Sequence, residues 1–242
     1  MDLTKYDLVL FKNSIIALNV SLDDSQIAQF MEYYELLVEW NQFMNLTAIT
    51  EFDEVCTKHF IDSISLCKAF DCAGDATVID IGTGAGFPGI PLKIAFPKLR
   101  ITLLDSLGKR VKFLNEVIGR LGLKDIEAIH GRAEDYAKPG LLRERYDLCV
   151  SRAVANLATL SEYCLPYVKI DGFFISYKSE KISDERQAAQ HAIESLGGSI
   201  YDQKEFILPN SDIYRNLFQI KKVKATPKKY PRKAGLPSKE PL

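Results

Sequence analysis

The stretch DIGTGAGFPGIPL, residues 80–92, most constrains the fold of this chain. It places four glycines and two prolines directly after the short apolar run at residues 76–79. A segment with so few bulky side chains lets the backbone approach another group closely. The run TVIDI, the loop and the segment IPLKIAF predict the first strand–loop–helix unit of an α/β sheet, where ligands bind beyond the carboxyl ends of the strands. The loop is therefore a candidate ligand site, although a purely structural glycine turn is the alternative.

The chain after residue 76 alternates between strand and helix patterns. The short runs TVIDI, RITLLDS, IEAIHG, DLCVSR and GFFISYK lack clean alternation, which is typical of strands buried on both faces. Helical segments at 108–122 and 156–168 separate some of them, so we expect a parallel sheet covered by helices on both faces. After a helix at about 183–196, SIYDQKEFIL and YRNLFQIKKV follow each other without a helix and predict a closing antiparallel hairpin.

Residues 6–70 are predicted to be helical. One helix carries an apolar stripe, formed by Ile27, Phe30, Met31, Tyr34, Leu37 and Val38, with Ser21 or Asp23 as its N-cap. Another helix is expected from Phe52 to residue 70. We therefore divide the chain into a helical N-terminal extension (1–75), a ligand-binding α/β domain (76–222) and a C-terminal tail (223–242).

Charge is distributed unevenly along the chain. Residues 1–75 carry four basic and thirteen acidic side chains, whereas residues 221–242 carry eight basic and one acidic. The proline-rich basic tail is a candidate for phosphate contacts, or it is a solvated tail that aids solubility.

The five cysteines form no CxxC pair and the three histidines lie well apart, so neither a metal site nor a disulfide framework is expected. The chain has no apolar run long enough to cross a membrane and no signal-peptide pattern, so we expect a cytoplasmic protein.

The glycine pattern excludes two phosphate ligands. A triphosphate-binding loop requires a Lys-Ser or Lys-Thr pair that is missing here, and Phe87 occupies the third glycine position of a dinucleotide fingerprint. The remaining pattern, Asp80, Gly82, Gly84 and Gly86, resembles motif I of class I S-adenosylmethionine-dependent methyltransferases. In this interpretation, Asp80 faces the amino group of S-adenosylmethionine, directly or through water. Asp105, at the end of the second strand, binds the ribose hydroxyls.

Longer segments resemble one methyltransferase family. WNQFMNLTAIT, HFIDSISL, DIGTGAGFPGIPLKI, LLDSLGKRVKFL, GRAEDY, YDLCVSRAVANLATLSEY and PRKAGLPSKEPL are similar to the ribosomal RNA small-subunit methyltransferase G family and span residues 40–242. The resemblance implies a Rossmann-like class I methyltransferase fold with seven mostly parallel strands. It implies methyl transfer from S-adenosylmethionine to N7 of a guanine in the decoding region of 16S rRNA. It also implies cofactor contacts at Gly82, Phe87, Ala133, Glu134 and Arg152.

The sequence lacks the motifs of other methyl acceptors. The tetrapeptide that accompanies exocyclic-amine methylation is replaced by SRAVAN, and no cysteine follows a proline as pyrimidine-carbon chemistry requires. Guanine N7 has a lone pair and no proton, so its methylation needs positioning but no general base. We therefore name no catalytic residue. The alternatives are a methyltransferase of another RNA or of a small molecule, and a non-catalytic RNA-binding protein that retains the fold.

Cations near the expected cleft are the candidates for RNA contacts. These are Lys109 and Arg110 at a helix start, Arg132 beside the cleft, and Arg232 and Lys233 in the tail, which could fold back over the sheet. A solvated helix face is the alternative for the first two. Asn45, Thr47, His59 and Asp62 could line a guanine pocket, but we favour helix capping for Asn45 and Thr47. We expect a monomer that binds small-subunit rRNA.

Overall fold

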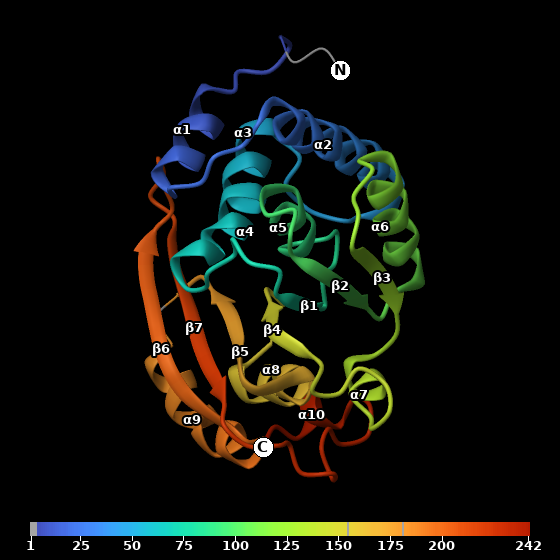
Figure 1. The fold of residues 1–242 in the computed structure, drawn as a ribbon, viewed down its shortest axis with the longest axis vertical. Coiled ribbons are helices and arrows are strands. Elements are labelled where there is room, and N and C mark those ends of the chain that lie inside the picture. Colours follow the sequence, from blue (N-terminus) through green and yellow to red (C-terminus); the bar gives the residue numbers. More distant parts are fainter. Residues whose placement is uncertain (1–3, 154, 181) are drawn as a thin grey trace.

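The computed structural model describes residues 4–153, 155–180 and 182–242, which form a sheet covered by helices on both faces (Figure 1). The strands in this part of the chain are β1 (Thr77–Ile81), β2 (Arg100–Asp105), β3 (Ile126–His130), β4 (Tyr146–Ser151), β5 (Val168–Lys178), β6 (Gly198–Ile207) and β7 (Tyr214–Lys222). Their order in the sheet is β3-β2-β1-β4-β5-β7-β6. Strands β1 to β5 are parallel, and β7 is antiparallel to both β5 and β6. The predicted mostly parallel sheet with a closing hairpin is confirmed.

The helices form two layers. The first face carries α1 (Val9–Ala17), α2 (Asp24–Met44), α3 (Phe52–Val55), α4 (Asp62–Ile64), α5 (Gly89–Ala95) and α6 (Gly108–Arg120). The second carries α7 (Ala133–Tyr136), α8 (Leu157–Cys164), α9 (Ser183–Ser195) and α10 (Leu236–Lys239). Alternate strand residues supply the two cores: Val78 and Val150 pack into the first, and Ile79 and Cys149 pack into the second. Burial on both faces explains why the strand sequences lack polar alternation.

The N-terminal helices share the first core with the sheet. Asp23 is the N-cap of α2 and forms a capping box with Gln26, which decides between the two predicted caps. The predicted stripe is buried at Ile27, Phe30, Met31 and Leu37, whereas Tyr34 and Val38 are half-buried. No helix in the described ranges is both long and apolar enough to cross a membrane.

The helix that follows α2 changes its hydrogen-bonding period. The segment Cys56–Ile61 is π-helical and lies between α3 and α4, and a 3₁₀ turn at Ser65–Lys68 ends the run. π-Helical turns are rare and often occur at functional sites. His59, in the π-helical segment, and Asp62, at the start of α4, are both buried, with 8% and 1% of their surface exposed.

The C-terminal tail packs against α8 and forms specific contacts. Arg232 makes a bidentate ion pair with Glu162, with Nη2 2.6 Å from Oε2, and Glu162 is 1% exposed. Arg143 donates to the carbonyl of Tyr230, and the amide of Gly235 donates to Glu134. The tail therefore folds back as expected, but the guanidinium of Arg232 is occupied by Glu162 inside the fold and does not face a cleft.

This ion pair leads to a stability prediction. Arg232→Ala leaves the buried Glu162 carboxylate without its cation, which should lower the free energy of unfolding by about 3 kcal/mol. Lys233→Ala removes an exposed neighbour and should change it by less than about 0.5 kcal/mol. Urea unfolding of both variants measures the difference. Equal stability of the two variants would show that the pair does not hold the tail in place.

Candidate active site

Two cavities adjoin at the carboxyl ends of the parallel strands. The first cavity has a volume of about 490 Å³ and lies over the ends of β1, β2, β3 and β4. The second cavity has a volume of about 690 Å³ and lies between the ends of β4 and β5 and the segment Phe52–Lys68. Both volumes are within the range of ligand pockets. Ala153 and Ala155 line both cavities, so groups bound in the two would meet beside the end of β4.

The glycine-rich loop is shaped by positive φ angles and a buried acid. Gly82, Gly84 and Gly86 have φ of 72°, 64° and 102°, which side chains other than glycine rarely adopt. Asp80 is fully buried, and its Oδ2 accepts hydrogen bonds from Thr83 Oγ1 at 2.7 Å and Gly89 N at 2.9 Å. Within the described ranges no donor reaches its Oδ1. Burial raises the pKa of Asp80 to about 6.

Acidic side chains lie at the ends of the strands around the first cavity. Asp105, at the end of β2, is 3% exposed and accepts hydrogen bonds from Gly84 N and Leu107 N, both at 2.9 Å. Its Oδ2 also lies 3.4 Å from Nη1 of Arg110. Glu134, at the start of α7, lines the same cavity and is 5% exposed. Apolar residues such as Leu104 and Leu160 and the basic residues Arg110 and Arg132 also line the cavity, so it combines apolar surface with acidic and basic side chains.

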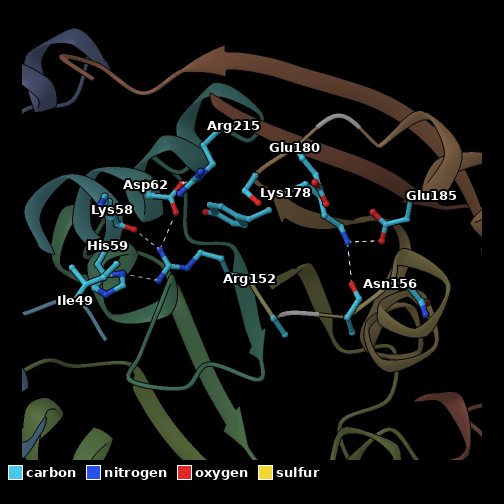
Figure 2. A pocket seen from close by; sticks show the side chains of 14 residues that line it. Ile49, Lys58, His59, Asp62, Arg152, Asn156, Lys178, Glu180, Glu185 and Arg215 are labelled. Carbon is cyan, nitrogen blue, oxygen red and sulfur yellow. Dashed lines mark hydrogen bonds and ion pairs between the residues drawn. The ribbon is translucent and has the colours of Figure 1, made fainter. Parts of the chain in front are cut away.

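The second cavity contains a connected group of charged side chains (Figure 2). Asp62 lies between two arginines and accepts from Arg152 Nη1 at 2.9 Å and from Arg215 Nε at 2.6 Å. Arg152 also donates to the carbonyl of Lys58 at 3.1 Å, and its Nη2 is 3.1 Å from His59 Nδ1. Arg152 follows β4, Arg215 belongs to β7, and the others come from the π-helical segment and α4. The cavity wall is therefore assembled from three separate parts of the chain.

His59 is held in one orientation. Since Arg152 donates to Nδ1, the proton of the neutral ring is on Nε2, which lies 2.9 Å from Thr47 Oγ1. The ring stacks on Phe87 with centroids 4.4 Å apart. Burial and the Arg152 cation lower the pKa of His59 to about 3, so the ring is neutral at physiological pH.

Asn45 ends α2 in a left-handed conformation, as its predicted capping role requires, whereas Thr47 contacts His59 and Ile49 N instead of capping a helix.

The structure brings together only some of the predicted site residues. The first cavity is lined by Gly82, Asp105, Arg110, Arg132, Ala133 and Glu134. Arg152 lines the second cavity and not the first. The remaining candidates line neither: Asp80, Gly84, Gly86, Phe87, Lys109, Arg232 and Lys233. Phe87 is 6% exposed and lies under His59 and Arg152, with the guanidinium carbon 5.1 Å from its ring centre.

Sequence reasoning missed part of the second cavity. Arg215, Tyr177 and Lys178 line it, yet they lie in segments that were interpreted only as strands. Strand β7 also contains Asn216, Gln219, Lys221 and Lys222, so a charged residue in this strand did not single out Arg215. Its carboxylate partner is 153 positions away in sequence, so the pairing itself was not predictable.

The neutral His59 predicts a specific pH dependence of stability. Below its unfolded-state pKa of 6.5 the unfolded chain gains a proton, whereas the folded chain does not gain it until about pH 3. The His59 contribution to stability is therefore complete above pH 6.5 and decreases as the pH falls through this window, by about 2 kcal/mol between roughly pH 7 and 5. Asp80, whose pKa is raised, acts in the opposite direction. The measurement therefore compares urea unfolding of the unmodified chain with that of His59→Gln, which retains Asp80. Parallel pH profiles for the two proteins would contradict the prediction.

Comparisons with known proteins show the family of this chain. The model of the family described as GidB, rRNA small subunit methyltransferase G, matches residues 26–213. A protein from Lachnoclostridium phytofermentans named Ribosomal RNA small subunit methyltransferase G is 55% identical over 232 residues, which cover 96% of both chains. A protein of the same name from Acetivibrio thermocellus is 56% identical over 223 residues, covering 92% of this chain and 91% of its own.

Solved structures support the fold. A SAM dependent methyltransferase from Aquifex aeolicus matches with a TM-score of 0.52 at 18% identity, over 73% of this chain and 96% of its own. TYW2 from M. jannaschii, solved in complex with AdoMet, gives the same TM-score and identity over 67% of this chain and 77% of its own. From the family match and the close relatives together, this chain belongs to the rRNA small subunit methyltransferase G family of S-adenosylmethionine-dependent enzymes.

Proposed function

We propose that this chain transfers the methyl group of S-adenosylmethionine to N7 of a guanine in small-subunit ribosomal RNA. The observation that carries the proposal is the second cavity, which adjoins the first and holds no strong base among its described lining residues. His59 has a pKa of about 3, Asp62 accepts from two arginines, and Lys178 is paired with Glu185 at 2.6 Å. The remaining carboxylate there, Glu180, is exposed. Such a cavity suits an acceptor atom that has no proton to lose.

The first cavity fits S-adenosylmethionine. Asp105 is a buried carboxylate at the end of β2, where it can accept hydrogen bonds from ribose hydroxyls. Ala133 and Glu134 would face the adenine edge. Gly82 lines this cavity with φ of 72°, a backbone conformation that favours glycine, and the absence of a side chain lets the methionyl part approach the backbone. The buried Asp80 holds the loop in shape, and its unpaired Oδ1 is the atom through which a water could reach the amino group.

The residues of this chain would position the reactants and exclude water. When bound, S-adenosylmethionine supplies an electrophilic methyl group on a positively charged sulfur. N7 of guanine carries an in-plane lone pair and no proton, so proximity and orientation are the main contributions that the protein has to make. The His59–Phe87 stack forms a rigid wall beside Arg152, between the glycine loop and the second cavity. We name no catalytic acid or base for this reaction.

The RNA surface that we propose surrounds the mouth of the first cavity. Arg110 and Arg132 line that cavity, Lys109 is exposed beside them at the start of α6, and Lys233 is exposed in the tail. Arg232 contributes instead to the tail's attachment through Glu162. We also propose that the enzyme acts as a monomer in the cytoplasm, and that residues 1–75, 76–222 and 223–242 are its helical extension, methyltransferase domain and tail.

The reaction is tested with labelled S-adenosylmethionine and small-subunit RNA or particles from cells that lack the enzyme. After digestion, 7-methylguanosine should be the labelled nucleoside. The rate at saturating substrates should change by less than about twofold between roughly pH 6.5 and 8.5, because no group has to lose a proton. A methylated exocyclic amine or pyrimidine, or a rate that rises about tenfold per pH unit, would contradict the proposal.

The cofactor site is tested by a matched pair of carboxylates. Asp105→Asn should weaken S-adenosylmethionine binding by about tenfold to a hundredfold, because charge-assisted hydrogen bonds contribute roughly 1.5–3 kcal/mol. Asp147→Asn changes a carboxylate at the amino end of β4, which lines neither cavity, and should leave the affinity unaltered. Titration calorimetry measures both. Equal affinities of the two variants would exclude Asp105 from the site.

A further inference from the structure

Two arginines from different strands share one buried carboxylate at the wall of the second cavity. Arg152 and Arg215 both bind Asp62, at 2.9 and 2.6 Å, and the three side chains are 19%, 15% and 1% exposed. One carboxylate neutralises one guanidinium, so the group has a net charge of +1. A largely buried excess charge is unfavourable unless an opposite charge approaches it.

The two guanidinium groups retain unused donors. Each guanidinium has five N–H bonds. In the described structure Arg152 uses three, toward Lys58 O, Asp62 and His59, and Arg215 uses two, toward Asp62 and Tyr214 O. Two N–H groups of Arg152 and three of Arg215 are therefore available, and both side chains line the cavity (Figure 2).

Arg152 and Arg215 form the cationic end of the cavity, because its other charged side chains are paired or acidic. Lys178 is paired with Glu185 at 2.6 Å, and Lys58 is paired with Glu54. His59 is neutral and accepts a hydrogen bond from Arg152. Glu180 is an exposed carboxylate that also lines the cavity, and no ion pair to it is found in the described ranges. Glu180 disfavours an anion on its own side, so an anion is directed to the two arginines.

We propose that Arg152 and Arg215, held in place by Asp62, bind a phosphodiester group of the substrate RNA adjacent to the nucleotide that is methylated. Paired guanidinium groups match the oxygens of a phosphate in geometry and charge. The inference rests on the proposed function, which places the acceptor nucleotide in the second cavity. Arg215 is then a positioning residue that anchors the RNA backbone, at a distance from the reacting atoms.

Arg215→Gln tests this subsite without leaving a buried charge unpaired. The substitution retains the Arg152–Asp62 pair and reduces the net charge of the group to zero. For unmodified small-subunit RNA, we expect affinity to fall about tenfold, and the slope of log affinity against log salt to decrease by about 0.7, the value for one phosphate contact on a single strand. Arg215→Lys should retain most of the slope. Arg100→Gln, at the exposed amino end of β2 and outside both cavities, should leave the slope unchanged.

Mononucleotide inhibition identifies the phosphate itself. Guanosine 5′-monophosphate or 3′-monophosphate should inhibit the unmodified enzyme at about tenfold lower concentration than guanosine does, and Arg215→Gln should abolish this preference. Equal inhibition by guanosine and both monophosphates, or a salt slope unaffected by Arg215→Gln, would overturn the proposal. The methylated nucleoside is identified in the same reactions. A product other than 7-methylguanosine would overturn the proposed function, while the salt slope still tests the phosphate subsite.

Discussion

The buried carboxylate of Asp80 joins the two ends of the glycine-rich loop, and the site depends on that closure. The same oxygen accepts from the Thr83 hydroxyl at the start of the loop and from the Gly89 amide at the start of α5. A Cβ on Gly89 would overlap the buried side chain of Leu103 in β2, so the closed loop favours glycine there. Closure places Gly82 in the first cavity and Phe87 under the wall of the second. One buried interaction thus shapes both parts of the site.

The N-terminal helices complete the site that the sheet begins. The sheet contributes Arg152 and Arg215, but the carboxylate that orients them, Asp62, comes from the segment Phe52–Lys68. A second connection runs through Tyr33 of α2, whose hydroxyl donates to the Ala85 carbonyl in the glycine-rich loop at 2.5 Å. The helical region is therefore part of the enzyme's working structure, because without it the second cavity would lack the wall formed by Ile49, Lys58, His59 and Asp62.

Local patterns predicted the elements well where short-range signals decide them. Strand β1 has the predicted bounds, because an apolar run ends there at glycine. Strand β5 begins at Val168, four residues earlier than the predicted run, because Lys169 to Gly172 resemble a turn. Arg232 was assigned to RNA binding because it lies in a basic tail, yet its partner is Glu162, 70 positions earlier. A contact between residues so far apart in the sequence forms only when the chain folds back on itself, and local composition does not predict it.

The sequence alone determined the alternation of strands and helices, the glycine loop and the acids at two strand ends, because each depends on backbone geometry within a few residues. Asp105 could be placed in the first cavity since parallel strands end at one edge of the sheet. Only the tertiary structure decided that Asp62, Arg152 and Arg215 form one charged group. These residues lie at positions 62, 152 and 215, and they form one group with a net charge of +1 only when folding brings their side chains together and removes them from water.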